Sequence, residues 1–203
     1  MIPDKSILKT EAVFSDDREY RYLLKKEWDN KKPKATIIMT NPSISDMVKT
    51  DYTTMFIINN LVKLDYGSFD ILNLVPKIST KINLLEIENI PAEIFDENVK
   101  YIKKSAEQAE IVLIAWGSLE SKAVTVIKND VLDSLKPFED KLFTISNEYG
   151  GKSYHPLAPQ IRSIWLFNKY DLNDKKADDK KQEAEKSAGT DDGTELNTIK
   201  EDL

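Results

Sequence analysis

The chain has 203 residues, of which 32% are charged and 40% hydrophobic, and its net charge is −6 at pH 7. This composition fits one globular domain with a full hydrophobic core, and no apolar run approaches the ~18 residues that cross a bilayer. The absence of cysteine excludes disulfides, thiolate metal sites and cysteine nucleophiles. The first residues show no apolar segment after a basic one, so we expect a cytoplasmic protein with no membrane partner.

Strands and helices are predicted in alternation along the first half of the chain. Alternating aromatic and basic residues predict a strand within 14–28. The apolar run at 35–39 is short and β-branched, and the run at 69–75 ends at Pro76, so both predict buried strands. Between them, 54–63 has apolar residues at helical spacing, which completes a βαβ unit.

The second half continues this alternation after an irregular connection at 78–92. Apolar spacing predicts further helices and strands, namely helices at 93–108, 119–135 and 160–170 and strands at 110–116 and 141–145. The whole pattern predicts one three-layer α/β/α domain over about residues 10–172, with a central, mainly parallel, four-stranded sheet. We expect this domain to be a monomer.

The last segment, 173–203, has a different composition from the rest. It holds ten acidic residues and six lysines, a net charge of −4, which leaves −2 of the total −6 for the preceding residues. With almost no aromatic or β-branched residues it cannot bury enough apolar surface to offset ordering, so we predict a disordered acidic tail. The near-neutral body neither supports nor excludes binding to DNA.

The predicted strand at 35–39 breaks abruptly at Asn41-Pro42-Ser43. Pro42 fixes its own φ and pushes Asn41 toward extended geometry, so a helix cannot run through this point. Several polar residues follow, at Ser43, Ser45, Asp46, Asp51, Thr53 and Thr54. Ligands of open α/β sheets bind beyond the carboxyl ends of strands, so this segment is a candidate site. The alternative is a simple Asn-Pro turn between a strand and a helix.

Polar residues also follow the other predicted parallel strands. Asn73 lies near the end of the second strand, and His155, the only histidine, follows the last strand between a Gly-Gly loop and a proline. Because these strand ends meet at one edge, we expect four polar side chains to face one pocket, namely Asn41, Asp51, Asn73 and His155. The alternatives are a capping or surface role for His155 and a buried, backbone-bonded role for Asn73.

Several kinds of chemistry are poorly represented. A single histidine without cysteines disfavours a zinc site, and the sequence has no Gly-rich phosphate loop and no Gly-x-Ser-x-Gly elbow. We therefore expect no metal and no cofactor. The remaining chemistry is a water activated by a carboxylate or an amide, with His155 as electrophile or hydrogen-bond donor.

Five motifs occur in order along the chain, YRYLLKKEWD, IIMTNPS with Asp51-Tyr52-Thr53, ILNLVP, IVLIAWGS and GGKSYHPLAP. This set spans about residues 14–165 and resembles a family of short bacterial and phage proteins without an assigned function. That family in turn looks like the uracil-DNA glycosylase superfamily, in which a Gly-x-Asp-Pro or Gly-x-Asn-Pro loop, an Asn, a Trp-Gly and a His-Pro-Ser-Pro loop follow successive strands. Here Met39-Thr40 replaces the glycine, and His-Pro-Leu-Ala-Pro replaces the last motif.

The resemblance implies roles for individual residues. Asn41 falls on the residue that positions or activates the attacking water, Asn73 on the base-reading Asn, and His155 on the residue that stabilises charge on the departing base. Asp51 is a second candidate for holding the water or the sugar. Further substrate contacts are implied for Pro42, Ser43 and Phe56, for Arg162 near a phosphate-binding position, and for Ile161 near a position that wedges the duplex.

These roles imply a DNA glycosylase that hydrolyses the N-glycosidic bond of a flipped-out base. Uracil-specific members of the superfamily have a tyrosine at the position of Ser43, where it rejects pyrimidines substituted at C5. Ser43 therefore implies a preference for 5-substituted pyrimidines, such as the hydroxymethylated or glycosylated cytosines of some phage genomes, and a role in phage defence. The competing view is that Tyr52 or Phe56 fills the same space.

Two other functions stay open at this stage. The first is a non-catalytic protein that binds nucleic acid or nucleotides. The second is an N-glycosidase that acts on free nucleosides or nucleotides.

Overall fold

The computed structural model describes residues 5–43, 48–79, 83–117, 121–148 and 154–172. The predicted tail at 173–203, the Gly-Gly loop at 149–153, Ser45 and Asp46 lie outside these ranges. The residues up to Tyr170 belong to one compact unit.

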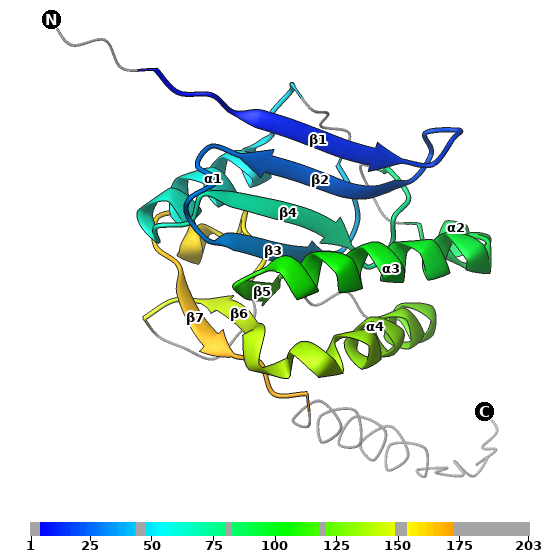
Figure 1. Ribbon diagram of the computed structural model, residues 1–203. Coiled ribbons are helices and arrows are strands. Elements are labelled where there is room, and N and C mark those ends of the chain that lie inside the picture. Colours follow the sequence, from blue (N-terminus) through cyan, green and yellow to red (C-terminus); the bar gives the residue numbers. More distant parts are fainter. Residues whose placement is uncertain (1–4, 44–47, 80–82, 118–120, 149–153, 173–203) are drawn as a thin grey trace, which may run out of the picture. The chain divides into compact units, whose positions relative to one another are not determined.

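One mixed sheet of seven strands forms the centre of this unit (Figure 1). The strands are β1 (Lys9–Phe14), β2 (Arg21–Glu27), β3 (Lys34–Met39), β4 (Ser68–Asn73), β5 (Ile111–Ile114), β6 (Leu142–Ser146) and β7 (Leu166–Lys169). Their order in the sheet is β1-β2-β4-β3-β5-β6-β7. The neighbours β4, β3, β5 and β6 run parallel to one another, whereas β2 is antiparallel to β4, and β1 and β7 are antiparallel to their own neighbours.

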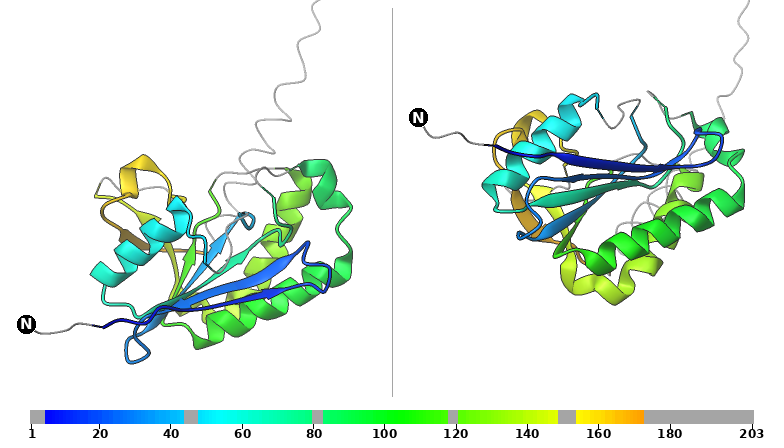
Figure 2. Two further views of the ribbon diagram at one scale, coloured as in Figure 1. Left: turned by 90° about the horizontal axis from the view of Figure 1, so that it is seen from above. Right: turned by 45° about the horizontal axis from the view of Figure 1, so that its top comes forward.

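Helices cover both faces of the sheet. The α-helices are α1 (Tyr52–Lys63), α2 (Leu84–Glu88), α3 (Ala92–Gln108) and α4 (Lys122–Leu135), and the 3-10 helices are η1 (Lys136–Lys141) and η2 (Pro159–Ile161). Helix α1 lies on one face, and α3 and α4 lie on the other (Figure 2). Among the helices described here, none combines the length and the apolar character needed to cross a membrane.

The α/β class is confirmed, but the prediction of a four-stranded sheet is wrong. The four predicted parallel strands are present, and three antiparallel strands extend the sheet on both sides. The predicted helix at 160–170 is also wrong, because this segment forms η2 and then β7. Pairing with β6 decides its conformation, with Phe167 opposite Ile145, and edge pairing of this kind overrides a short stretch of helical spacing. The connection at 78–92, predicted as irregular, contains α2.

The face of the sheet under α1 carries a contiguous apolar core. Side chains alternate along each strand, so every second residue of the central strands points to this face. These residues pack with Ile57 and Leu61 of α1 and with Ile161 and Trp165, which follow the last loop. The core therefore fixes α1 and the segment after His155 over the same part of the sheet.

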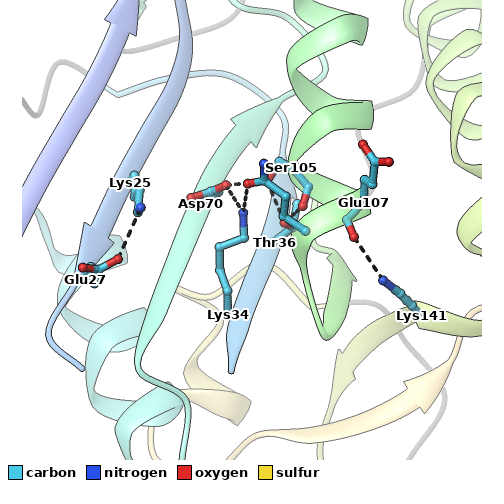
Figure 3. Close-up of polar contacts among 9 residues, drawn as sticks. Lys25, Glu27, Lys34, Thr36, Asp70, Ser105, Glu107 and Lys141 are labelled. Carbon is cyan, nitrogen blue, oxygen red and sulfur yellow. Dashed lines mark hydrogen bonds and ion pairs between the residues drawn. The ribbon is translucent and has the colours of Figure 1, made fainter. Parts of the chain in front are cut away.

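The opposite face holds a buried polar network beside α3 (Figure 3). The Lys34 ammonium lies 2.8 Å from Asp70 Oδ2, which also accepts a hydrogen bond from the Ser105 hydroxyl at 2.7 Å. The Thr36 and Ser105 hydroxyl oxygens are 2.7 Å apart. Because these residues come from β3, β4 and α3, the network ties the N-terminal halves of two parallel strands to the helix that covers them.

Candidate functional site

Asn41 follows β3 and has its side-chain amide held by backbone groups. Its Nδ2 donates to the carbonyl oxygen of Ser79 at 2.7 Å. The Ser79 amide in turn donates to the Pro42 carbonyl at 3.2 Å, so the segments after β3 and β4 are bonded to each other. With Nδ2 committed to a carbonyl, Asn41 presents its Oδ1 as a hydrogen-bond acceptor.

Asp51 is the N-cap of α1 and joins this helix to the loop after β3. One carboxylate oxygen, Oδ1, accepts from the Thr54 amide at 2.7 Å, as capping aspartates do. The other, Oδ2, accepts from the Ser43 hydroxyl at 2.7 Å. The Ser43 proton therefore points toward Asp51, and the loop residue Ser43 is fixed against the start of the helix.

His155 is held by a tight turn that lies between β6 and η2 along the chain. The turn is closed by the Ala158 amide, which donates to the His155 carbonyl at 2.8 Å, and Pro156 occupies the position that proline favours in such turns. The Leu157 amide donates to His155 Nδ1 at 3.2 Å. An accepting Nδ1 carries no proton, so the neutral ring has its proton on Nε2.

The charge state of His155 follows from its surroundings. Burial lowers the pKa of His155 below its ordinary value, and the smaller attraction of Asp51 opposes this effect. The ring is therefore neutral at pH 7, and it can act as an uncharged donor through Nε2.

Arg21, the first residue of β2, reaches the same region from the strand beyond β4, on the opposite flank from β6. The register of β1 and β2 shifts between Val13 and Phe14, which leaves Tyr22 as an extra residue in a β-bulge. Tyr22 stacks on Tyr101 of α3, with ring centroids 5.4 Å apart, while the guanidinium of Arg21 lies on the α1 face. Because β2 is antiparallel to β4, its first residue lies at the carboxyl edge of the parallel strands.

These groups surround a cavity of about 280 Å³ beneath the first turn of α1. The described residues that line it are Arg21, Met39, Asn41, Ser43, Asp51, Thr53, Thr54, Ile71, Ser79 and His155. Met39 and Ile71 form an apolar floor, and all the other lining residues are polar or charged. The volume lies near the low end for ligand pockets, so it suits a single small ring better than a large ligand.

The structure brings together four of the residues predicted as a site, Asn41, Ser43, Asp51 and His155. Thr53 and Thr54, noted among the polar residues after Pro42, line the same cavity. Sequence reasoning missed Arg21 and Ser79. The signal for Arg21 was a single arginine at the start of strand β2, next to the apolar residues Tyr22, Leu23 and Leu24.

Asn73 lies beside the cavity floor without lining it. It pairs with Met39 across β3 and β4 and points to the same face as Ile71, two residues earlier. The side chain is fully buried, and its amide nitrogen and oxygen have no hydrogen-bond partner among the residues that the structure describes. The backbone-bonded alternative for this side chain therefore does not hold. Such an orphaned buried amide indicates a place where a ligand or a water completes the bonding.

The other predicted substrate contacts lie outside the cavity lining. Phe56 packs under the Arg162 guanidinium, which is 5.7 Å from the ring centroid. The Pro42 carbonyl accepts a hydrogen bond from the Ser79 amide, in the segment after β4. Ile161 is fully buried in the core, so the prediction that it wedges a duplex is wrong, because a wedge must be exposed. Its neighbour Ile164 is 68% exposed. The phosphate-binding role of Arg162 stays a prediction.

The cavity offers donors and acceptors rather than a metal-binding set. Within the described ranges, no group of three or more His, Cys, Asp or Glu side chains is placed to hold a metal ion. Among the described residues that line the cavity, the charged groups are one guanidinium and one carboxylate, beside a neutral imidazole. This arrangement suits a small polar heterocycle with carbonyl oxygens.

Comparison with known proteins identifies a family. A search of curated proteins finds no match to the chain. The model of a family described as "Protein of unknown function (DUF1643)" matches residues 21–157. This segment runs from Arg21 to Leu157, so it contains all the described residues that line the cavity. The chain therefore belongs to the DUF1643 family.

Proposed function

We propose that the protein is a DNA glycosylase that hydrolyses the N-glycosidic bond of a modified base flipped out of DNA. One observation carries the proposal. The cavity at the carboxyl edge of the sheet places the fixed Asn41 amide and the neutral His155 ring around a space of single-base size. The resemblance of the NPS and HPL motifs to the uracil-DNA glycosylase superfamily supports the same reading.

The reaction would use these two groups at opposite ends of the breaking bond. The bond from the base nitrogen to C1′ breaks with its electron pair leaving on the base, a water oxygen adds to C1′, and the proton that this water loses finally neutralises the base anion. Asn41 Oδ1 accepts a hydrogen bond from that water, and His155 Nε2–H donates to an oxygen of the departing base. The resemblance also assigns reading of the base edge to Asn73, whose amide lies beside the floor without lining the cavity.

The small side chain of Ser43 affects which base the cavity can accept. Neither Tyr52 nor Phe56 is among the described residues that line the cavity, and Tyr52 is 74% exposed. The proposed substrates are therefore 5-substituted pyrimidines, such as the hydroxymethylated or glycosylated cytosines of phage DNA. Phage defence by a cytoplasmic monomer is the corresponding biological role.

The direct test is base release from duplex and single-stranded oligonucleotides that carry a panel of modified bases, read by mass spectrometry. Asn41→Ala and His155→Ala should each lower the rate about 10²- to 10³-fold, as removal of a preorganised group does. Asn59→Ala, on the exposed side of α1, is the matched control and should keep the full rate. Full abasic-site formation by both site variants would refute the assigned roles.

A second candidate function is base removal from free nucleosides or nucleotides. The observation that favours it is the net charge of −2 before residue 173, which gives no general excess of positive charge for a DNA backbone. Release from free nucleotides at rates above release from DNA would support it. Strongly salt-dependent DNA binding with no base release from any substrate would instead favour a non-catalytic binding protein.

A further inference from the structure

We propose that Arg21 forms an anion-binding subsite in the cavity and holds the pyrimidine as it leaves as an anion, at the edge opposite His155. This inference rests on the proposed function and adds a residue that the resemblance does not assign.

Arg21 is a permanent charge in a buried position that faces the cavity. Arg21 is only 2% exposed to solvent, yet its side chain lines a cavity large enough for a ligand. Burial lowers the pKa of Arg21, and the smaller effect of Asp51 opposes this shift. Desolvating a guanidinium is costly, so a negative charge placed in the cavity would stabilise it.

The Asp51 carboxylate accepts two hydrogen bonds at the start of α1. Its oxygens accept from the Thr54 amide and the Ser43 hydroxyl, both at 2.7 Å. Asp51 is thus held at the start of α1. Arg21 lines the same cavity as Asp51, so a ligand with acceptor oxygens that enters it would meet the guanidinium.

The sheet order places Arg21 and His155 on opposite sides of the cavity. Arg21 belongs to β2, on one side of β4 and β3, and His155 follows β6, on the other side of the same strands. The floor residues Met39 and Ile71 come from the two strands between them. A flat heterocycle lying on this floor would present one edge to the guanidinium and the other to the imidazole.

The bulge in β2 is the device that aims the side chain. With Tyr22 as the extra residue, Tyr22 stacks on α3 on one face while Arg21 points to the other. Bulges often re-aim a side chain next to a binding site. The start of α1 borders the same cavity through Thr53 and Thr54, and the N-terminal end of a helix also favours negative charge.

The Arg21 cation can stabilise the negative charge on the departing base more strongly than the neutral His155 ring can alone. When the C1′–N bond breaks, its electron pair becomes a negative charge delocalised over the ring nitrogen and the carbonyl oxygens of the base. A neutral imidazole donates one hydrogen bond to that charge, whereas a guanidinium adds a full positive charge and two parallel donors. The ground-state base is neutral, so the cation stabilises chiefly the transition state.

Ligand binding tests the subsite without any need for catalysis. The full chain is titrated calorimetrically with barbiturate, a pyrimidine that is anionic at neutral pH, and with uracil, which is neutral. The wild type should prefer barbiturate, and Arg21→Gln should weaken barbiturate binding about 10- to 100-fold while changing uracil binding much less. Arg18→Gln, an exposed arginine in the β1–β2 turn, is the matched control.

Three results would overturn the subsite: no preference for barbiturate in the wild type, an equal loss of both ligands in a folded Arg21→Gln, or loss of the preference in a folded Arg21→Lys, which keeps the charge. If Arg21→Gln does not fold, Arg21→Lys alone tests whether a positive charge at this position sets the preference for barbiturate. An intact preference together with no base release from any substrate would support the subsite and refute the glycosylase.

The part played in the reaction has its own measurement. Base release is compared across pyrimidines whose leaving anions differ in stability. Arg21→Gln should slow the poorest leaving groups most and so steepen the dependence of rate on leaving-group pKa, while Arg18→Gln should leave the slope unchanged. A uniform slowing of all bases by Arg21→Gln would contradict a role at the departing anion.

Discussion

Ser43 combines two properties that matter for substrate choice, a small side chain and a hydroxyl bonded to Asp51. The hydrogen bond to Asp51 uses the serine proton, so toward a substrate the oxygen acts as an acceptor. This changes the expected contact with a 5-hydroxymethyl group, which would donate to Ser43 rather than accept from it.

Replacing Ser43 with tyrosine should close the space beside C5 of the bound pyrimidine. We expect Ser43→Tyr to lose activity on bulky 5-substituted bases while retaining or gaining activity on plain uracil, because a ring at this position excludes substituents by contact. Rates of base release on matched oligonucleotides measure this. Ser43→Ala, which keeps the space and removes the hydroxyl, is the control. Unchanged cleavage of bulky bases by the tyrosine variant would refute the open-gate model.

His155 gives the protein a specific dependence of stability on pH. Burial lowers its pKa in the folded state, so the unfolded chain takes up a proton at a pH where the folded chain does not. The stabilisation from neutral His155 is present above the unfolded value of about 6.5 and is lost as the pH falls through it toward the lower folded pKa.

Because His155 is the only histidine, a single substitution isolates this contribution. We expect the free energy of unfolding of the wild type to fall more than that of His155→Gln between about pH 8 and about pH 5.5. Urea denaturation at both values measures it, and shared carboxylates cancel in the difference. An equal fall in both proteins would show that His155 is not buried in its neutral form.

At the scale of elements, the network around Asp70 joins β3, β4 and α3 on the face opposite the cavity. The Lys34 and Asp70 side chains are only 14% and 6% exposed. Asp70→Ala would leave the ammonium without its counter-charge and the Ser105 hydroxyl without its acceptor. We expect a loss of about 3–5 kcal/mol in the free energy of unfolding, measured by urea denaturation.

Glu97→Ala is the matched control, since it removes a carboxylate from an exposed pair with Lys100 on α3 itself. Exposed pairs of this kind contribute little, so the unfolding midpoint should stay close to that of the wild type. Similar losses in the two variants would indicate that the Asp70 network is no more than a surface-type contact.

Strand β2 shows why part of the site could not be predicted. The sequence pattern predicts that Asn41 and His155 meet at one edge, because parallel strands collect their carboxyl ends there, and both line the cavity, whereas Asn73 lies beside it. The direction of β2 in the sheet and its bulge depend on pairing with β1 and β4, which no local pattern specifies. Arg21 therefore reaches the cavity through tertiary pairing alone.

Residues 160–170, at the end of the compact unit, show that local sequence patterns also fail to predict part of the fold. Residues 160–170 have helical apolar spacing, yet Ile161 and Trp165 enter the core and the following residues pair with β6. A spacing of three and four residues also fits a short 3-10 turn followed by a strand, when a partner strand is available. The central strands were predictable because their apolar runs are buried on both faces.

The charge distribution of the whole chain yields the last prediction. Residues 173–203 carry −4 and the rest −2, so removing this segment lowers the negative charge without touching the compact unit that ends at Tyr170. If DNA is the substrate, we expect a chain of residues 1–172 to bind a duplex about 3- to 10-fold more tightly at low salt. The gain should shrink above about 0.1 M salt, where the Debye length falls to about 10 Å. Fluorescence anisotropy over a salt series measures both effects. A full-length variant with four of the ten acidic residues of this segment changed to Asn or Gln makes the segment neutral and so separates charge from length, and it should match the truncated chain. Binding by both proteins that equals the wild type at every salt concentration would show that the acidic segment does not oppose DNA.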